Sequence, residues 1–205
     1  MFKYYNGEEF ELEQDNEHGY AFVKILYHNI ASGYFNTSNV EHVGSCHDGV
    51  YSRLDYLDIL KTTKDDKYIF KLKYPKFSDR IEIWKQTNKP QNDTNYSSNS
   101  LGYEPIVHNS SVFGGLSLSS SSGDAYLDGD KFNGGWWFAV GTYAIYHGGM
   151  PGPIVGDSNV CDSVELWLAT DLNKFINISR TNSDIYKNVH ENVIDMEILD
   201  TLKGE

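Results

Sequence analysis

Apolar and polar residues alternate along several segments of this chain, which is the pattern of a strand with one buried face. The alternation occurs in residues 19–28, 68–75, 80–85 and 163–169, and residues 136–146 form a continuous apolar and aromatic run. Segments rich in Ser, Asn and Gly separate several of these runs. The pattern predicts an antiparallel β-sandwich, of jelly-roll or concanavalin-like type, from which helices are largely missing.

One segment departs from this period. In residues 51–61 the leucines Leu54, Leu57 and Leu60 recur at helical spacing, and Ser52 stands where a helix N-cap belongs. We therefore expect one brief helix there.

The alternation also suggests how the chain is divided. We expect residues 1–18 to be an N-terminal arm, residues 19–170 the β-sandwich domain, and residues 171–205 a C-terminal tail. The tail is polar with scattered apolar residues. Docking on a partner and packing back onto the same domain both remain open for it.

Charge narrows the possible partners. The chain has 29 acidic and 17 basic residues, a formal net charge of -12. This balance argues against nucleic-acid binding and against adsorption to anionic membranes, because both need a basic surface. No stretch approaches the roughly 18 apolar residues of a membrane span, and the first residues lack the apolar run of a secretion signal. We expect no membrane insertion, and a protein that is either cytosolic or carried outside the cell as part of a larger assembly.

The string GGWWFAVGTYAIYHGGMPGP, residues 134–153, is the most distinctive part of the sequence. Trp136 and Trp137 are neighbours, so in a strand they would point to opposite faces. An exposed Trp offers a flat apolar surface to a sugar ring, whereas packing in an aromatic core explains the same letters. Gly and Pro in residues 148–153 predict a rigid turn.

Trp84 is a second candidate contact, because the alternation puts it on a polar face with Arg80 and Glu82. Trp167, which shares the expected outward face of its strand with Glu165, could likewise be either an exposed contact residue or a covered one. The alternative for Trp84 is coverage by the polar segment 87–100. The candidate ligand-binding residues are Trp84, Trp136, Trp137, Tyr143, Tyr146 and His147.

Metal ligands are suggested at two places. Asp124, Asp128 and Asp130 form D-x3-D-G-D in an expected loop, and clustered carboxylates with an intervening Gly can hold Ca²⁺. The string lacks the order of an EF-hand, so a solvated turn or hydrogen bonds to sugar hydroxyls are the alternatives. No other cofactor is expected.

The second place is the string HVGSCH, which contains His42, Cys46 and His47. A structural zinc needs about four ligands, so His28 or Cys161 would have to complete the set. A buried cysteine and loop histidines explain the same letters. Two cysteines are too few for a disulfide framework, and their pairing is left open.

Catalytic motifs are missing from the sequence. It contains no G-x-S-x-G, no H-E-x-x-H and no P-loop. Glu82 and Glu165 lie on expected strands, and a retaining glycosidase would need two such carboxylates about 5 Å apart. Nothing in the sequence places them together, so we expect a protein that is not an enzyme.

Three groups of strings resemble a lectin-like β-sandwich module of bacteriophage virion and tail-fibre proteins, also found in some secreted invertebrate proteins. They are KILYHN followed by YSRLDYL, IEIWKQTNKP followed by GYEPI, and the aromatic string above followed by VELWL. The resemblance covers residues 19–169. It implies a module mounted on a particle or cell surface for display or attachment, and it supplies no catalytic residues.

The expected function is therefore that of a non-enzymatic virion structural or attachment protein, associated with a capsid or a tail. Its β-sandwich would bind host-surface glycan or neighbouring virion proteins, and its tail would contact other virion proteins in a homo- or hetero-oligomeric assembly. The alternatives are a free carbohydrate-binding module or lectin, and a sandwich-fold enzyme acting on glycosides.

Overall fold

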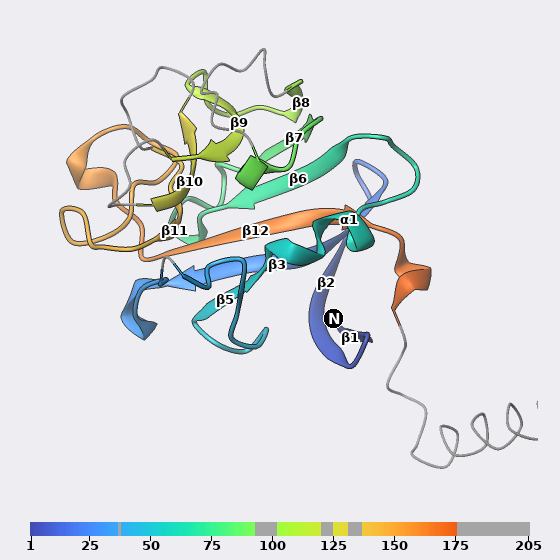
Figure 1. Ribbon diagram of the computed structural model, residues 1–205. Helices are drawn as coiled ribbons and strands as arrows, with labels where there is room; N and C mark the ends of the chain where they lie inside the picture. Colours follow the sequence, from blue (N-terminus) through green and yellow to red (C-terminus); the bar gives the residue numbers. More distant parts are fainter. Residues whose placement is uncertain (37, 93–101, 120–124, 131–136, 176–205) are drawn as a thin grey trace, which may run out of the picture.

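The computed structural model describes residues 1–36, 38–92, 102–119, 125–130 and 137–175. Their strands form two antiparallel sheets, so the predicted antiparallel β-sandwich is confirmed. The large sheet has the strand order β1-β2-β3-β12-β6-β7-β8, with β5 beside β3 and β4 beside β5. The small sheet has the order β11-β10-β9 and lies over one face of the large sheet (Figure 1).

The large sheet contains β1 (Phe2–Tyr5), β2 (Glu8–Asp15), β3 (Tyr20–Asn29), β4 (His42–Val43), β5 (Val50–Arg53), β6 (Tyr68–Lys73), β7 (Glu82–Gln86), β8 (Glu104–Val107) and β12 (Ser163–Thr170). The small sheet contains β9 (Phe113–Leu118), β10 (Ala125–Asp130) and β11 (Val140–Thr142).

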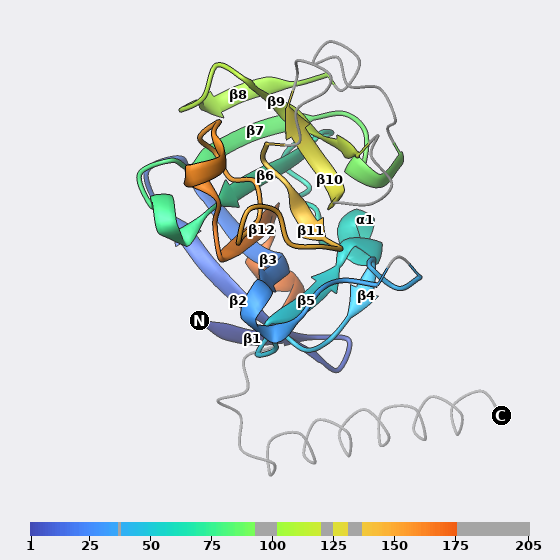
Figure 2. The ribbon, with the colours of Figure 1, turned by 90° about the vertical axis from the view of Figure 1, so that its left-hand side faces the viewer.

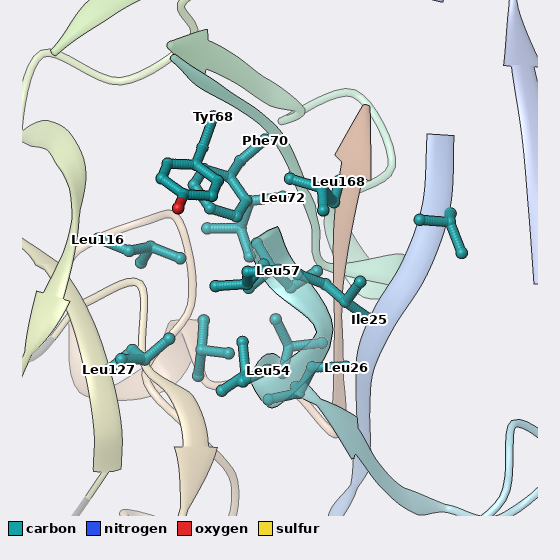
Figure 3. Packing of buried hydrophobic residues seen from close by; sticks show 14 of the residues in the cluster. Ile25, Leu26, Leu54, Leu57, Tyr68, Phe70, Leu72, Leu116, Leu127 and Leu168 are labelled. Carbon is teal, nitrogen blue, oxygen red and sulfur yellow. The ribbon is translucent and has the colours of Figure 1, made fainter. Parts of the chain in front are cut away.

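The core fills the space between the sheets. Leu116 of β9 and Leu127 of β10 point toward Phe70 and Leu72 of β6 and toward Leu168 of β12 (Figure 3). Each of these side chains is at most 1% exposed. Their burial removes apolar surface from water on both sheets, which is the main favourable contribution to folding.

Strand β12 lies between β3 and β6, although nearly 90 residues separate it from β6 in sequence. It pairs with β3 from Ser163↔Asn29 to Thr170↔Ala21 and with β6 from Glu165↔Lys73 to Leu168↔Phe70. Figure 1 shows β12 inside the sheet, between β6 and β3. A buried central strand explains why Val164, Leu166 and Leu168 are fully buried.

Residues 1–18 belong to the sandwich, so the expected separate arm is wrong. In Glu8–Asp15, Phe10 and Leu12 alternate with acidic residues and are 0% and 2% exposed. β2 pairs with β3, and β1 pairs with β2. Residues 2–15 therefore form strands of the large sheet. The two buried side chains of β2, Phe10 and Leu12, cover the edge of the core.

The beginning of the expected tail also packs on the domain. The Phe175 ring lies 5.9 Å from that of Phe10, and Lys174 Nζ donates to the carbonyls of Ile59 and Lys61. Residues 176–205, the rest of the expected tail, lie outside the described residues.

The expected helix is present but shorter than the pattern suggested. A 3-10 turn, Leu54–Tyr56, leads into α1 (Leu57–Leu60), and all three leucines of the pattern are buried. Ser52 is not the N-cap, because β5 continues through Arg53 and the Ser52 hydroxyl donates to the carbonyl of Glu41. No helix in the described part of the chain is long and apolar enough to cross a membrane.

The face of the large sheet away from the small sheet carries lysines laid over aromatic rings. Lys24 and Lys73 lie 4.8 Å from the Trp167 ring, and Lys71 lies 4.8 Å from the Phe22 ring. These lysines also pair with carboxylates of β2. The lysine stems cover apolar rings while the ammonium groups stay paired.

Strand β7 faces the opposite way from the prediction. Trp84 pairs with Phe70, is 0% exposed, and packs edge-on against Phe113 of the small sheet at 4.7 Å. Its indole N–H donates to Gln86 Oε1 at 2.8 Å, and the Gln86 side chain bonds both backbone groups of Leu116. Trp84 is therefore a core residue that joins the sheets, and its predicted exposure is wrong.

We expect Trp84→Ala to destabilise the protein by about 3–5 kcal/mol, because it opens a cavity between the sheets and removes the buried hydrogen bond to Gln86. Chemical denaturation monitored by far-UV circular dichroism measures this loss. Ile59→Ala is the control, since Ile59 is 45% exposed and its loss should cost less than about 0.5 kcal/mol. Equal effects of the two changes would contradict the role of Trp84.

Candidate functional site

Three of the predicted ligand-binding residues come together: Trp137, which precedes β11, and Tyr146 and His147, which follow it. The Trp137 and Tyr146 ring centroids are 6.4 Å apart, and those of Tyr146 and His147 are 4.2 Å apart, both edge-on. Asp157 completes the group, because its Oδ1 accepts the Tyr146 hydroxyl at 2.7 Å and its Oδ2 lies 3.7 Å from His147 Nε2. We call Trp137, Tyr146, His147 and Asp157 the aromatic surface.

A tight turn holds this group. The backbone of Tyr146 bonds that of Gly149 in both directions at 2.8 Å, so His147 and Gly148 form a two-residue hairpin turn. Both have positive φ, 44° and 89°, as a type I′ turn requires. Asn-Gly or Gly-Gly would fit this turn with less strain than a bulky side chain at the first position. The turn therefore presents the His147 imidazole in a conformation that costs local free energy.

The segments around the turn are tied down by backbone hydrogen bonds. Met150 and Cys161 bond each other in both directions at 2.8 Å, and the N–H of Phe138 donates to the carbonyl of Gly152 at 3.1 Å. Phe138 has a φ of 63°. The expected strand over 136–146 is therefore wrong for its described residues 137–146, because the strand there covers Val140–Thr142 and Phe138 turns the chain.

The aromatic surface can hold a small polar ligand with an apolar face. Tyr146 is half-buried and His147 exposed, and Ile145 and Val155 nearby in sequence are 57% and 54% exposed. The hydrogen bond to Asp157 raises the pKa of Tyr146, so its hydroxyl stays protonated and Asp157 stays paired. Aromatic edges beside a carboxylate and an imidazole combine stacking with directional hydrogen bonds.

Two other aromatic candidates, Tyr143 and Trp84, do not join this group. Tyr143 is half-buried and packs against the core, and burial raises its pKa to about 12. Trp84 is in the core, as described above. Trp136 lies outside the described residues. Asp157 was missed by the sequence reasoning, because a single Asp in a Gly-rich segment has no spacing that connects it with Tyr146.

The acidic candidates lie on a strand and not in the expected loop. Asp128 and Asp130 are on β10, 5% and 9% exposed, while Asp124 lies outside the described residues. Burial raises the pKa of Asp128 to about 7, and the Asp130 charge adds to the rise although the Asp130 N–H donates to Asp128 at 2.8 Å. A solvated turn is thus wrong for these two carboxylates, and calcium remains a prediction.

The expected zinc set is not assembled as predicted. His42 bonds Asp55 at 2.8 Å, and buried His28 lies against the Gly33 carbonyl and the Thr142 hydroxyl. Cys46 and Cys161 are both buried free thiols, so they do not pair with each other. Cys46 and His47 do meet, together with Glu9 of β2, a donor that sequence spacing did not reveal.

The two strand carboxylates weighed for glycosidase chemistry lie on opposite faces of the large sheet. Glu82 pairs with Leu72 and Glu165 with Lys73, and neighbouring residues of β6 point to opposite faces. Burial raises the pKa of Glu82 to about 7. Glu82 binds His108 and Asn109, whereas Glu165 accepts from Trp167. This pair cannot flank one glycosidic bond.

We expect Asp128→Asn to stabilise the protein at pH 8 in the presence of a chelator, by on the order of 1–3 kcal/mol. The folded state favours protonated Asp128, so the wild type loses stability as the pH rises from about 4 to about 7. At pH 4 the two proteins should therefore unfold at similar urea concentrations. Asp79→Asn, at a side chain 79% exposed, is the control without such a pH dependence.

The same two proteins test calcium. Added Ca²⁺ should raise the melting temperature of the wild type and not that of Asp128→Asn if these carboxylates bind it. A variant that is less stable than the wild type at pH 8 in chelator would contradict the unfavourable burial of the charge.

Comparison with known protein families, with curated proteins and with solved structures found no match to this chain.

Proposed function

We propose that this chain is a non-enzymatic attachment protein whose aromatic surface binds a glycan. The observation that carries the proposal is the convergence of Trp137, Tyr146 and His147 with Asp157 in one group of side chains. Sugar rings have an apolar face and a rim of hydroxyls, so they are suited to aromatic side chains placed next to hydrogen-bonding groups. The turn geometry at His147 adds support, because local strain is often retained where a side chain has a function.

Charge favours a neutral glycan. Asp157 stands within the aromatic surface, and the whole chain has a formal net charge of -12. Sulfated or sialylated sugars would be repelled by both, whereas neutral hydroxyls can donate to the Asp157 carboxylate. The expected ligand is therefore a neutral hexose unit of a surface polysaccharide.

The setting we propose is the surface of a virion, in a capsid or a tail. It is supported by the resemblance of residues 19–169 to lectin-like modules of bacteriophage virion and tail-fibre proteins. In this setting the C-terminal segment contacts other virion proteins and the aromatic surface faces the host cell. The rival is a free lectin, which would share the sugar site but not the assembly.

We expect binding to neutral glycans on an array, with Tyr146→Ala weakening it about tenfold or more, equivalent to about 1.4 kcal/mol. Isothermal titration with the best array hit measures the affinity. Tyr34→Ala is the matched control, because Tyr34 is 39% exposed and outside the aromatic surface.

His147→Gly separates binding from packing in the same experiment. Glycine fits the positive φ of this position, so the variant should be at least as stable as the wild type and still bind more weakly. No array signal, or Tyr146→Ala and His147→Gly that leave the affinity unchanged, would rule out the glycan site and leave packing as the role of these rings.

We expect removal of residues 176–205 to abolish self-association or co-assembly while glycan affinity stays unchanged. Keeping Phe175 preserves its packing on Phe10. Sedimentation velocity of the full chain and the shortened chain measures the assembly state. A full chain that is monomeric and fails to bind virion proteins would favour the free lectin.

A further inference from the structure

Three metal-binding side chains meet where the N-terminal hairpin contacts the connection between β4 and β5. Glu9 belongs to β2, and Cys46 and His47 follow β4. His47 Nε2 lies 2.6 Å from Glu9 Oε2, and Cys46 Sγ lies 3.9 Å from the same oxygen. The ligand atoms all lie within 4.8 Å of one another. We propose that Glu9, Cys46 and His47 form a binding site for Zn²⁺ or a chemically similar divalent transition metal.

The spacing suits one tetrahedral ion. Ligand atoms bound to the same zinc are about 3.3–3.6 Å apart, as follows from Zn–N and Zn–O bonds near 2.0–2.1 Å and Zn–S bonds near 2.3 Å. The Glu9–His47 pair would open by about 0.7 Å and the Glu9–Cys46 pair would close by about 0.3 Å to reach that spacing. The Cys46 and His47 ligand atoms, which lie within 4.8 Å of each other, would close by up to about 1.3 Å. Rotation of the His47 side chain can supply most of this movement, because His47 is exposed.

The donor set selects the kind of metal. A thiolate and an imidazole favour zinc, cobalt and copper over calcium and magnesium, which prefer oxygen ligands only. Cys46 is 7% exposed, whereas the His47 side chain is 58% exposed, so an ion would reach the site from the His47 side. Three protein ligands leave one tetrahedral position for water or for a partner's side chain.

Neighbouring residues already orient two of the ligands. Tyr4 of β1 is the cross-strand partner of Glu9, so the two side chains stand next to each other on one face of the sheet. The Phe2 ring lies 5.0 Å from the His47 ring. Such outer contacts hold metal ligands in position in known sites.

His42 is not a ligand, although the string HVGSCH suggests it. Its ring lies between Asp55 at 2.8 Å and Glu8 at 3.8 Å. The geometry thus replaces His42 by Glu9, which is 37 positions before Cys46 in the chain. The bound ion would join the β1–β2 hairpin to the β4–β5 connection, and Figure 2 shows these elements at the same end of the molecule.

The test uses the full chain with any affinity tag removed, and Zn²⁺ and Co²⁺ as the probes. We expect one equivalent of Zn²⁺ to bind and to raise the melting temperature. Bound Co²⁺ should give a thiolate-to-cobalt charge-transfer band and the intense visible bands of tetrahedral cobalt. Cys46→Ser should remove the charge-transfer band, and Glu9→Gln and His47→Asn should each weaken zinc binding at least tenfold.

His42→Asn and Cys161→Ser are the matched controls and should leave the affinity and the cobalt spectrum unchanged. Circular dichroism verifies that every variant is folded, and the cobalt spectrum of the unaltered chain is a readout that depends on no variant. Absence of stoichiometric binding would overturn the proposal, as would a charge-transfer band that survives in Cys46→Ser or is lost in Cys161→Ser. A loss of affinity in His42→Asn equal to that in His47→Asn would also overturn it.

Discussion

The pairing of β12 with both β3 and β6 is the constraint on which the large sheet depends. Without β12, β3 and β6 would each present an open edge, and the apolar faces of both would lack a continuous surface for the small sheet. Because its partners lie within the first 73 residues of the chain, the sheet depends on contacts between residues far apart in sequence. Such a topology forms slowly compared with one built from neighbouring hairpins.

The sequence pattern identified the antiparallel sandwich and four of its strands, β3, β6, β7 and β12, because one-sided burial produces alternation where a strand covers the core. The pattern assigned the wrong face to β7. The residues two positions before and after Trp84, Glu82 and Gln86, are polar and yet point into the core with it. Glu82 binds the backbone N–H of Asn109, and Gln86 binds Leu116. A polar residue that satisfies a neighbouring backbone group cannot be told from a solvated one by its letter alone.

The sequence predicted some members of each candidate site and missed others, because only residues close together in the chain can be grouped from the sequence. Trp137, Tyr146 and His147 lie within one short segment, so the sequence already places them near each other. Asp157 and Glu9 reach their groups through loop closure and strand pairing, which no local spacing records. Members of a site that come from a distant part of the chain can therefore be identified only from the three-dimensional structure.

The contact of Trp84 with Phe113 also gives the protein an optical reporter. The indole lies in an apolar environment between the sheets, with its N–H bonded to Gln86 and its edge against a ring of the small sheet. Trp167 lies on the other face of the large sheet, beneath lysines. The chain has four tryptophans, so variants that keep only Trp84 or only Trp167 would be needed; their fluorescence would distinguish separation of the sheets from disturbance of the outer face without an added label.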